Sequence, residues 1–115
     1  MSQPADRIPS PSARVTAWSG QEAPSEAAIR KLLAAEGLSG QRWGNGPLDV
    51  YLAHQHAYNK VIYVVSGSIT FSLPQEGTRI TMTAGDRLDL PAGTLHEAVV
   101  STQGVECLEA HWTTT

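Results

Sequence analysis

From residue 43 onward, apolar and polar residues alternate in short runs separated by turn signals. In residues 69–73 and 80–83, Ile, Phe, Leu or Met alternates with Thr or Ser. Side chains on a strand alternate between two faces, so this period of two predicts many short antiparallel strands. Such strands assemble into an all-β sandwich or barrel. The turn signals lie at residues 45–47, 66–68, 74–77, 84–86 and 91–93.

One segment before this region has a helical pattern. The sequence PSEAAIRKLLAAEG, residues 24–37, starts with Pro24 or Ser25 as a capping residue and ends at Gly37. Leu38 follows in the position that often packs back onto such a helix end. The expected apolar stripe of the helix consists of Ile29, Leu32 and Leu33.

The 115 residues are enough for one domain. Residues 1–13 carry three prolines and three serines without apolar periodicity, and a flexible arm is expected there. Residues 14–42 are expected to hold a short strand and the helix, and residues 43–115 the barrel.

Composition excludes several classes of protein. The eight basic residues are scattered along a chain of net charge −3, whereas a nucleic-acid-binding protein needs a basic patch. No apolar segment is long enough to cross a membrane, and no signal sequence is recognisable. A single cysteine, Cys107, excludes an internal disulfide and suits a reducing compartment, so a cytoplasmic protein is expected.

The longest apolar run, residues 61–65, has no polar position. A strand of this kind is covered on both faces. Its odd-numbered side chains, Val61, Tyr63 and Val65, must therefore pack on the helix or on a second subunit. The second alternative predicts a homodimer.

Two histidines and a lysine precede this run. His54, His56 and Lys60 have the same parity, as do Val50 and Leu52 before them. Residues of one parity share a face of a regular strand. If that face points inward, two imidazoles and one ammonium group converge on a small volume.

A second stretch, GDRLDLPAGTLH at residues 85–96, ends in another histidine. Gly85 suits a tight turn, and Pro91 and Gly93 interrupt the chain just before His96. This spacing ends one strand and turns the next one back, so that its first inward-facing residue is His96.

Together the two stretches resemble the motifs of the cupin superfamily. In the second cupin motif, Gly85, Pro91, Gly93 and His96 all match, while Val100 stands where asparagine is common. In the first motif His54, His56 and Gly67 match, but Lys60 stands in the place of the glutamate. With flanking strands, the resemblance covers roughly residues 43–112.

The resemblance implies a jelly-roll β-barrel with one short N-terminal helix and a divalent metal near the barrel centre. Carried over residue by residue, the ligands are His54, His56 and His96. Three imidazoles can hold Fe, Mn, Ni, Cu or Zn and leave positions open for water and substrate.

Lys60 conflicts with this ligand set. A glutamate would offset part of the metal's charge, whereas a protonated lysine adds a positive charge in a low-dielectric interior. Lys60 could be neutral, could turn its stem away, or could meet an anion. Alternatively no metal binds, and the ammonium group and the histidines together bind an acidic small molecule.

Other polar residues are weaker candidates. Tyr58 shares the parity of the histidines and either lines the pocket mouth or belongs to a loop. Glu109 and Glu97 are possible replacement carboxylates, although Glu97 has the opposite parity to His96. His111 is interpreted as a surface residue near the C-terminus.

Two functional hypotheses follow. In the first, the protein is a metal-dependent small-molecule enzyme, an oxygenase or isomerase of the cupin type. In the second, it is a non-catalytic cupin, with or without metal, that binds an acidic metabolite or a sugar.

Overall fold

The computed structural model describes residues 13–113. Apart from Ala13, the arm expected at residues 1–13 lies outside this range. Within it, no helix has the length and apolar character needed to cross a membrane. The elements are α1 (Glu26–Ala35) and the strands β2 (Arg14–Thr16), β3 (Gln41–Asn45), β4 (Val50–His54), β5 (Asn59–Leu73), β6 (Thr78–Thr83), β7 (Arg87–Leu90) and β8 (His96–Trp112).

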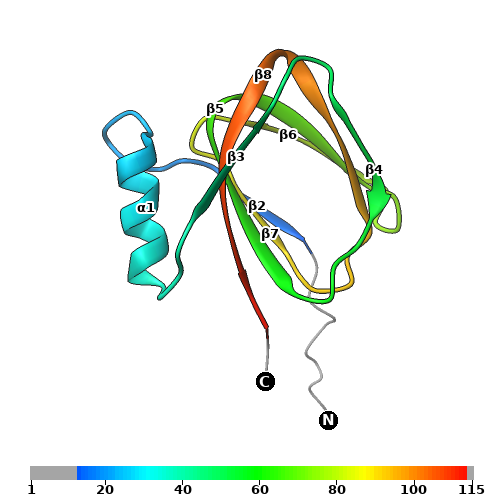
Figure 1. Cartoon of the computed structure of the whole chain (residues 1–115), viewed down its shortest axis with the longest axis horizontal. Helices are drawn as coiled ribbons and strands as arrows, with labels where there is room; N and C mark the ends of the chain where they lie inside the picture. Colours follow the sequence, from blue (N-terminus) through cyan, green and yellow to red (C-terminus); the bar gives the residue numbers. More distant parts are fainter. Residues whose placement is uncertain (1–12, 114–115) are drawn as a thin grey trace.

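Two long strands, β5 and β8, organise an antiparallel barrel (Figure 1). They pair with each other along nearly their whole length. The first half of β5 also pairs with β7, which carries β2 at its other edge, and the second half pairs with β6. The first half of β8 pairs with β4, and the second half pairs with β3. The expected all-β barrel with one short N-terminal helix is confirmed.

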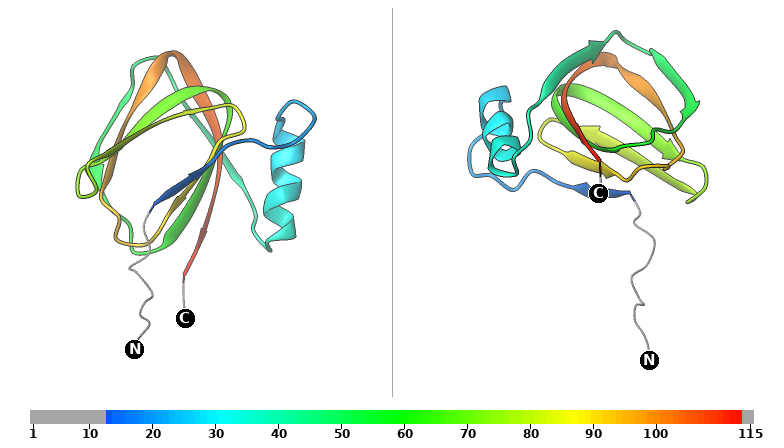
Figure 2. Two further views of the ribbon diagram at one scale, coloured as in Figure 1. Left: turned by 180° about the vertical axis from the view of Figure 1, so that it is seen from behind. Right: turned by 60° about the horizontal axis from the view of Figure 1, so that its bottom comes forward.

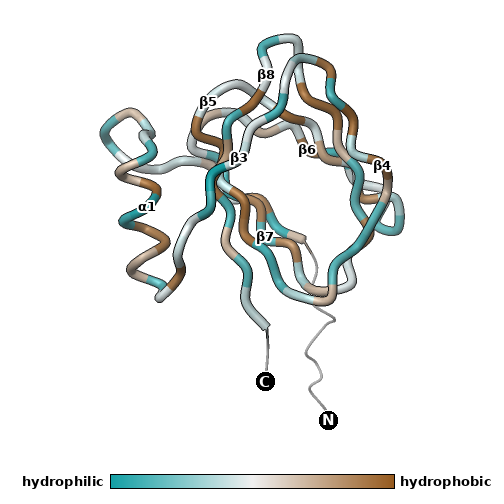
Figure 3. Tube along the Cα trace, viewed as in Figure 1, coloured by the Kyte–Doolittle hydropathy of each residue, from teal (hydrophilic) through white to brown (hydrophobic). Residues whose placement is uncertain are grey.

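The barrel encloses the larger of two hydrophobic clusters. Inward-facing residues of β5, β6, β7 and β8 supply it, including Ile62, Val64 and Leu88, each at most 1% exposed. Their positions alternate with outward-facing residues, so hydrophobic and hydrophilic segments follow one another along the strands in Figure 3. This alternation is the pattern from which the strands were expected.

The turn expected at residues 66–68 is instead a bend inside β5. The register of the β5–β8 pairing shifts on both sides of Gly67, which has a φ of 78°. A Cβ atom at this position would lie 2.1 Å from the carbonyl oxygen of Gly104 on β8. Glycine therefore lets the strand bend without leaving the ladder, and residues expected as two strands form one.

Helix α1 begins and ends where the sequence predicts. The Ser25 hydroxyl caps it by accepting a hydrogen bond of 3.1 Å from the backbone N–H of Ala28. At the other end Gly37 has a φ of 76°, and the Leu38 N–H donates to the carbonyl of Leu33 at 2.9 Å. Figure 2 shows the helix outside the barrel, against one side of it.

The second hydrophobic cluster joins this helix to the barrel. Ile29 and Leu33 pack with Val61 and Tyr63 of β5 and are fully buried, whereas Leu32 is 43% exposed. The expected stripe is thus correct at two positions and wrong at Leu32. Helix α1 covers Val61 and Tyr63 on the outer face of β5. The homodimer remains a prediction, without support from this face.

We expect Leu33→Ala to lower the free energy of unfolding by about 2–3 kcal/mol, because it leaves a cavity between the helix and β5. Leu32→Ala is the matched control. It removes the same atoms from an exposed neighbouring site and should cost less than about 1 kcal/mol. Urea denaturation followed by circular dichroism measures both variants. Equal losses would mean that the helix does not pack on the barrel through Leu33.

Candidate functional site

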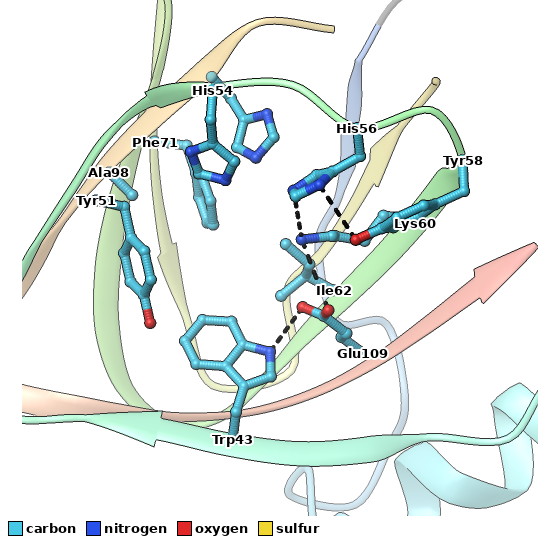
Figure 4. A pocket seen from close by; sticks show the side chains of 11 residues that line it. Trp43, Tyr51, His54, His56, Tyr58, Lys60, Ile62, Phe71, Ala98 and Glu109 are labelled. Atoms are coloured by element: carbon cyan, nitrogen blue, oxygen red, sulfur yellow. Dashed lines mark hydrogen bonds and ion pairs between the residues drawn. The ribbon is translucent and has the colours of Figure 1, made fainter. Parts of the chain in front are cut away.

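The barrel contains a cavity of about 390 Å³. Its wall combines aromatic and aliphatic side chains with a group of polar ones (Figure 4). The lining residues are Trp43, Tyr51, His54, His56, Tyr58, Lys60, Ile62, Phe71, His96, Ala98 and Glu109.

A bulge in β4 determines which side chains of this strand reach the cavity. Tyr51 pairs with Ala98 and His54 pairs with His96, so β4 has one residue more than β8 between these pairs. Tyr51 and His54 consequently both line the cavity. Val50 and Leu52 are 63% and 81% exposed. The expectation that these two share a face with His54 is wrong, because the bulge reverses the alternation.

Three histidines converge at one side of the cavity. His54 ends β4, His56 follows it in the loop, and His96 is the first residue of β8. One ring nitrogen from each lies within 4.8 Å of the other two. The ring centroids of His54 and His96 are 4.3 Å apart.

Backbone carbonyls orient two of these rings. The Nδ1 of His54 lies 2.7 Å from the carbonyl oxygen of Leu52, and that of His96 lies 2.9 Å from the carbonyl oxygen of Thr94. A carbonyl only accepts, so each Nδ1 carries a proton, and in the neutral ring each Nε2 keeps a free lone pair. Metal-binding histidines commonly have this arrangement.

His56 has a partner at both ring nitrogens. Its Nδ1 lies 3.1 Å from the hydroxyl of Tyr58, and the two rings stack with centroids 4.8 Å apart. Its Nε2 lies 3.3 Å from the Nζ of Lys60. Since an ammonium group only donates, the Nε2 of His56 is the acceptor of this bond.

Lys60 and Glu109 form an ion pair inside the pocket. Lys60 shares the inward face of β5 with Ile62 and Val64 and is 8% exposed. Its Nζ lies 3.6 Å from the Oε2 of Glu109 on β8. Glu109 thereby offsets the positive charge that Lys60 brings into the barrel.

Glu109 is itself held by two further groups. The indole Nε1 of Trp43 donates to its Oε1 at 2.7 Å, and the Nε2 of His111 lies 2.5 Å from its Oε2. The His111 ring also stacks on Tyr58, with centroids 4.2 Å apart. The side chain of His111 is 41% exposed, which agrees with its interpretation as a surface residue.

Burial keeps two of the three histidines neutral near pH 7. Loss of solvation lowers the pKa of His56 to about 4, and the charge of Lys60 acts in the same direction. Loss of solvation also lowers the pKa of His96, against the hydrogen bond to Thr94, which raises it. Neutral imidazole is the form that binds metal.

The donor set fits a divalent transition metal. Two imidazoles offer free Nε2 lone pairs, and the third offers one that Lys60 occupies. Imidazole nitrogen suits Zn, Cu, Fe and Ni. The apolar part of the wall, which includes Trp43, Tyr51 and Phe71, leaves room beside the histidines for a small organic molecule.

The sequence-based candidates thus lie together with residues that sequence reasoning did not place here. His54, His56, His96, Tyr58 and Lys60 all line the cavity. Glu109 was considered only as a replacement ligand and is a partner of Lys60. Trp43, Tyr51 and Phe71 were not expected in the site. Glu97 is absent from the cavity lining, as its parity indicated.

No sequence model of a known family and no curated protein matches the chain. Solved structures do. A cupin superfamily protein from Desulfitobacterium hafniense matches with a TM-score of 0.59 and 9% identity, over 89% of this chain and 78% of that one. An RmlC-like cupin from Shewanella frigidimarina matches with a TM-score of 0.56 and 24% sequence identity, over 64% of each chain. A polyketide cyclase from Streptomyces resistomycificus matches with a TM-score of 0.57 and 24% sequence identity, over 64% of this chain and 54% of that one.

Proposed function

The chain has the cupin fold, and we propose that it binds a divalent transition metal through His54, His56 and His96. The observation that carries the proposal is the convergence of three ring nitrogens within 4.8 Å of one another. The carbonyl contacts of His54 and His96 support it, because they direct an Nε2 lone pair of each ring away from the backbone.

A metal held by three histidines supplies a Lewis acid with open positions for a substrate. The surrounding side chains would orient that substrate, with Lys60 favouring a negatively charged group and the aromatic wall favouring an apolar one. The chemistry best suited to such a pocket is that of a metal-dependent oxygenase or isomerase. The likeness to a polyketide cyclase indicates that this fold accommodates enzymes.

A second candidate function is binding without catalysis. It is favoured by the contact between Lys60 and His56, in which the ammonium group occupies an imidazole nitrogen needed for metal. In this form the protein would bind an acidic metabolite or a sugar through Lys60 and the histidines, without metal.

Metal titration of the purified protein distinguishes the two. We expect one equivalent of metal per chain, by elemental analysis of protein prepared without chelator or nickel resin and by calorimetric titration of the metal-free protein with Zn²⁺ or Mn²⁺. Absence of metal in both measurements would refute the metal site. Binding of an anion by such a metal-free protein would then support the second function.

A further inference from the structure

Lys60 has few acceptors for a buried ammonium group. Its Nζ carries three N–H donors. Among residues 13–113, the acceptors that contact it are the Nε2 of His56 at 3.3 Å and the Oε2 of Glu109 at 3.6 Å. The residue is only 8% exposed, so an acceptor that it loses has to be replaced by a group inside the pocket.

Glu109 fixes the position of this ammonium group. Its carboxylate accepts from Trp43, contacts His111, and pairs with Lys60. Because Glu109 is anchored from two sides, it holds Lys60 in the pocket.

The Nε2 of His56 can serve only one partner at a time. Its single lone pair either accepts from Lys60 or binds metal, since the Nδ1 is engaged with Tyr58. If metal takes this lone pair, Lys60 loses its nearest acceptor and remains beside a second positive charge. An anionic group placed between the metal and the ammonium group of Lys60 would offset both positive charges and accept a hydrogen bond from Lys60.

We propose, on the basis of the metal site proposed above, that the ligand of this pocket is a small apolar carboxylate, and that Lys60 makes its binding and metal binding mutually reinforcing. The ammonium of Lys60 passes from His56 to the carboxylate when metal is present. The apolar body of the ligand lies against the wall that includes Trp43, Tyr51 and Phe71. A volume of about 390 Å³ suits a compact molecule of this kind.

Benzoate is a suitable probe because it joins a carboxylate to a flat apolar ring. We expect saturating benzoate to raise the affinity of the wild-type protein for Zn²⁺ by at least about fivefold in calorimetric titrations, and Zn²⁺ to raise the affinity for benzoate by the same factor. Benzamide, which has the same shape without the charge, should leave the Zn²⁺ affinity unchanged. A benzoate effect that benzamide reproduces would overturn the role of the carboxylate.

Variants of Lys60 test its part in the coupling. Lys60→Met and Lys60→Gln should still bind Zn²⁺, but benzoate should no longer raise their affinity. Weak association of benzoate with Zn²⁺ in solution is the same in all titrations, so it cancels in this comparison. Thermal denaturation checks that each variant is folded, and the glutamine variant retains a donor for Glu109. Coupling that persists in both variants would overturn the assignment to Lys60.

The outcomes distinguish the coupling between metal and carboxylate from the proposed metal site on which it rests. Absence of Zn²⁺ binding with and without benzoate would overturn the metal site itself. Zn²⁺ binding of equal affinity with and without benzoate would overturn the coupling alone. Acetate tests the apolar wall, because it has the carboxylate without the ring. It should require a higher concentration than benzoate to raise the Zn²⁺ affinity by the same factor. Equal potency of the two would overturn the assignment of an apolar ligand.

Discussion

His96→Ala is expected to lower the affinity for Zn²⁺ by more than about a hundredfold. Loss of a residue that only orients a metal-binding histidine typically costs between tenfold and a hundredfold, and loss of the ligand itself should exceed this. The fold should persist, because His96 begins β8 at the edge of the cavity and is not part of either hydrophobic cluster. Calorimetric titration of the metal-free variant measures the affinity, and circular dichroism checks the fold.

The fourth histidine of the chain provides the matched control. His111 contacts Glu109 and stacks on Tyr58, but it does not belong to the group of three converging rings. His111→Ala should therefore change the Zn²⁺ affinity by less than the His96 variant does, by about threefold at most, which corresponds to less than 1 kcal/mol. Similar losses in the two variants would show that Zn²⁺ binds elsewhere or without a defined ligand set.

The barrel and its helix could be predicted because each depends on local patterns. Alternation of polar and apolar residues determines which side of a strand is buried, whatever the partner strand. The helix ends at Ser25 and Gly37 are likewise local, since each depends on the conformation of one residue. The sequence also indicated the three histidines, whose spacing matches two known motifs.

Irregularities within strands could not be predicted in this way. The bulge in β4 inverts the alternation between Tyr51 and His54, so simple parity assigns Val50 and Leu52 to the wrong face. The bend at Gly67 similarly joins two expected strands into one. Both features depend on the pairing partner, which is far away in the sequence.

The partner of Lys60 depends on register between distant strands. In the β5–β8 pairing, Lys60 lies opposite His111 and Ile62 lies opposite Glu109. Glu109 shares the parity of Cys107, a member of the barrel core, and this signal could have placed it inside. The contact between Glu109 and Lys60 could be predicted only from the register of the β5–β8 pairing, and the parity of residues in one strand does not give this register.

Lys60→Glu is expected to raise the affinity for Zn²⁺ or Mn²⁺ by about tenfold to a hundredfold, or ~1–3 kcal/mol. The substitution removes an ammonium group that lies 3.3 Å from the Nε2 of His56, and it introduces a carboxylate near the same point. In the metal-free variant this carboxylate would also lie near Glu109, and their repulsion would favour binding of a cation.

Lys60→Met separates the two contributions, because it removes the ammonium group without adding a ligand. It should give a smaller increase in metal affinity than Lys60→Glu. The titrations are carried out without added carboxylate, since an anion bound by Lys60 would mask its repulsion of the metal. If wild type and both variants bind metal equally, the ammonium group does not compete for His56, and the contact between them has no part in metal binding.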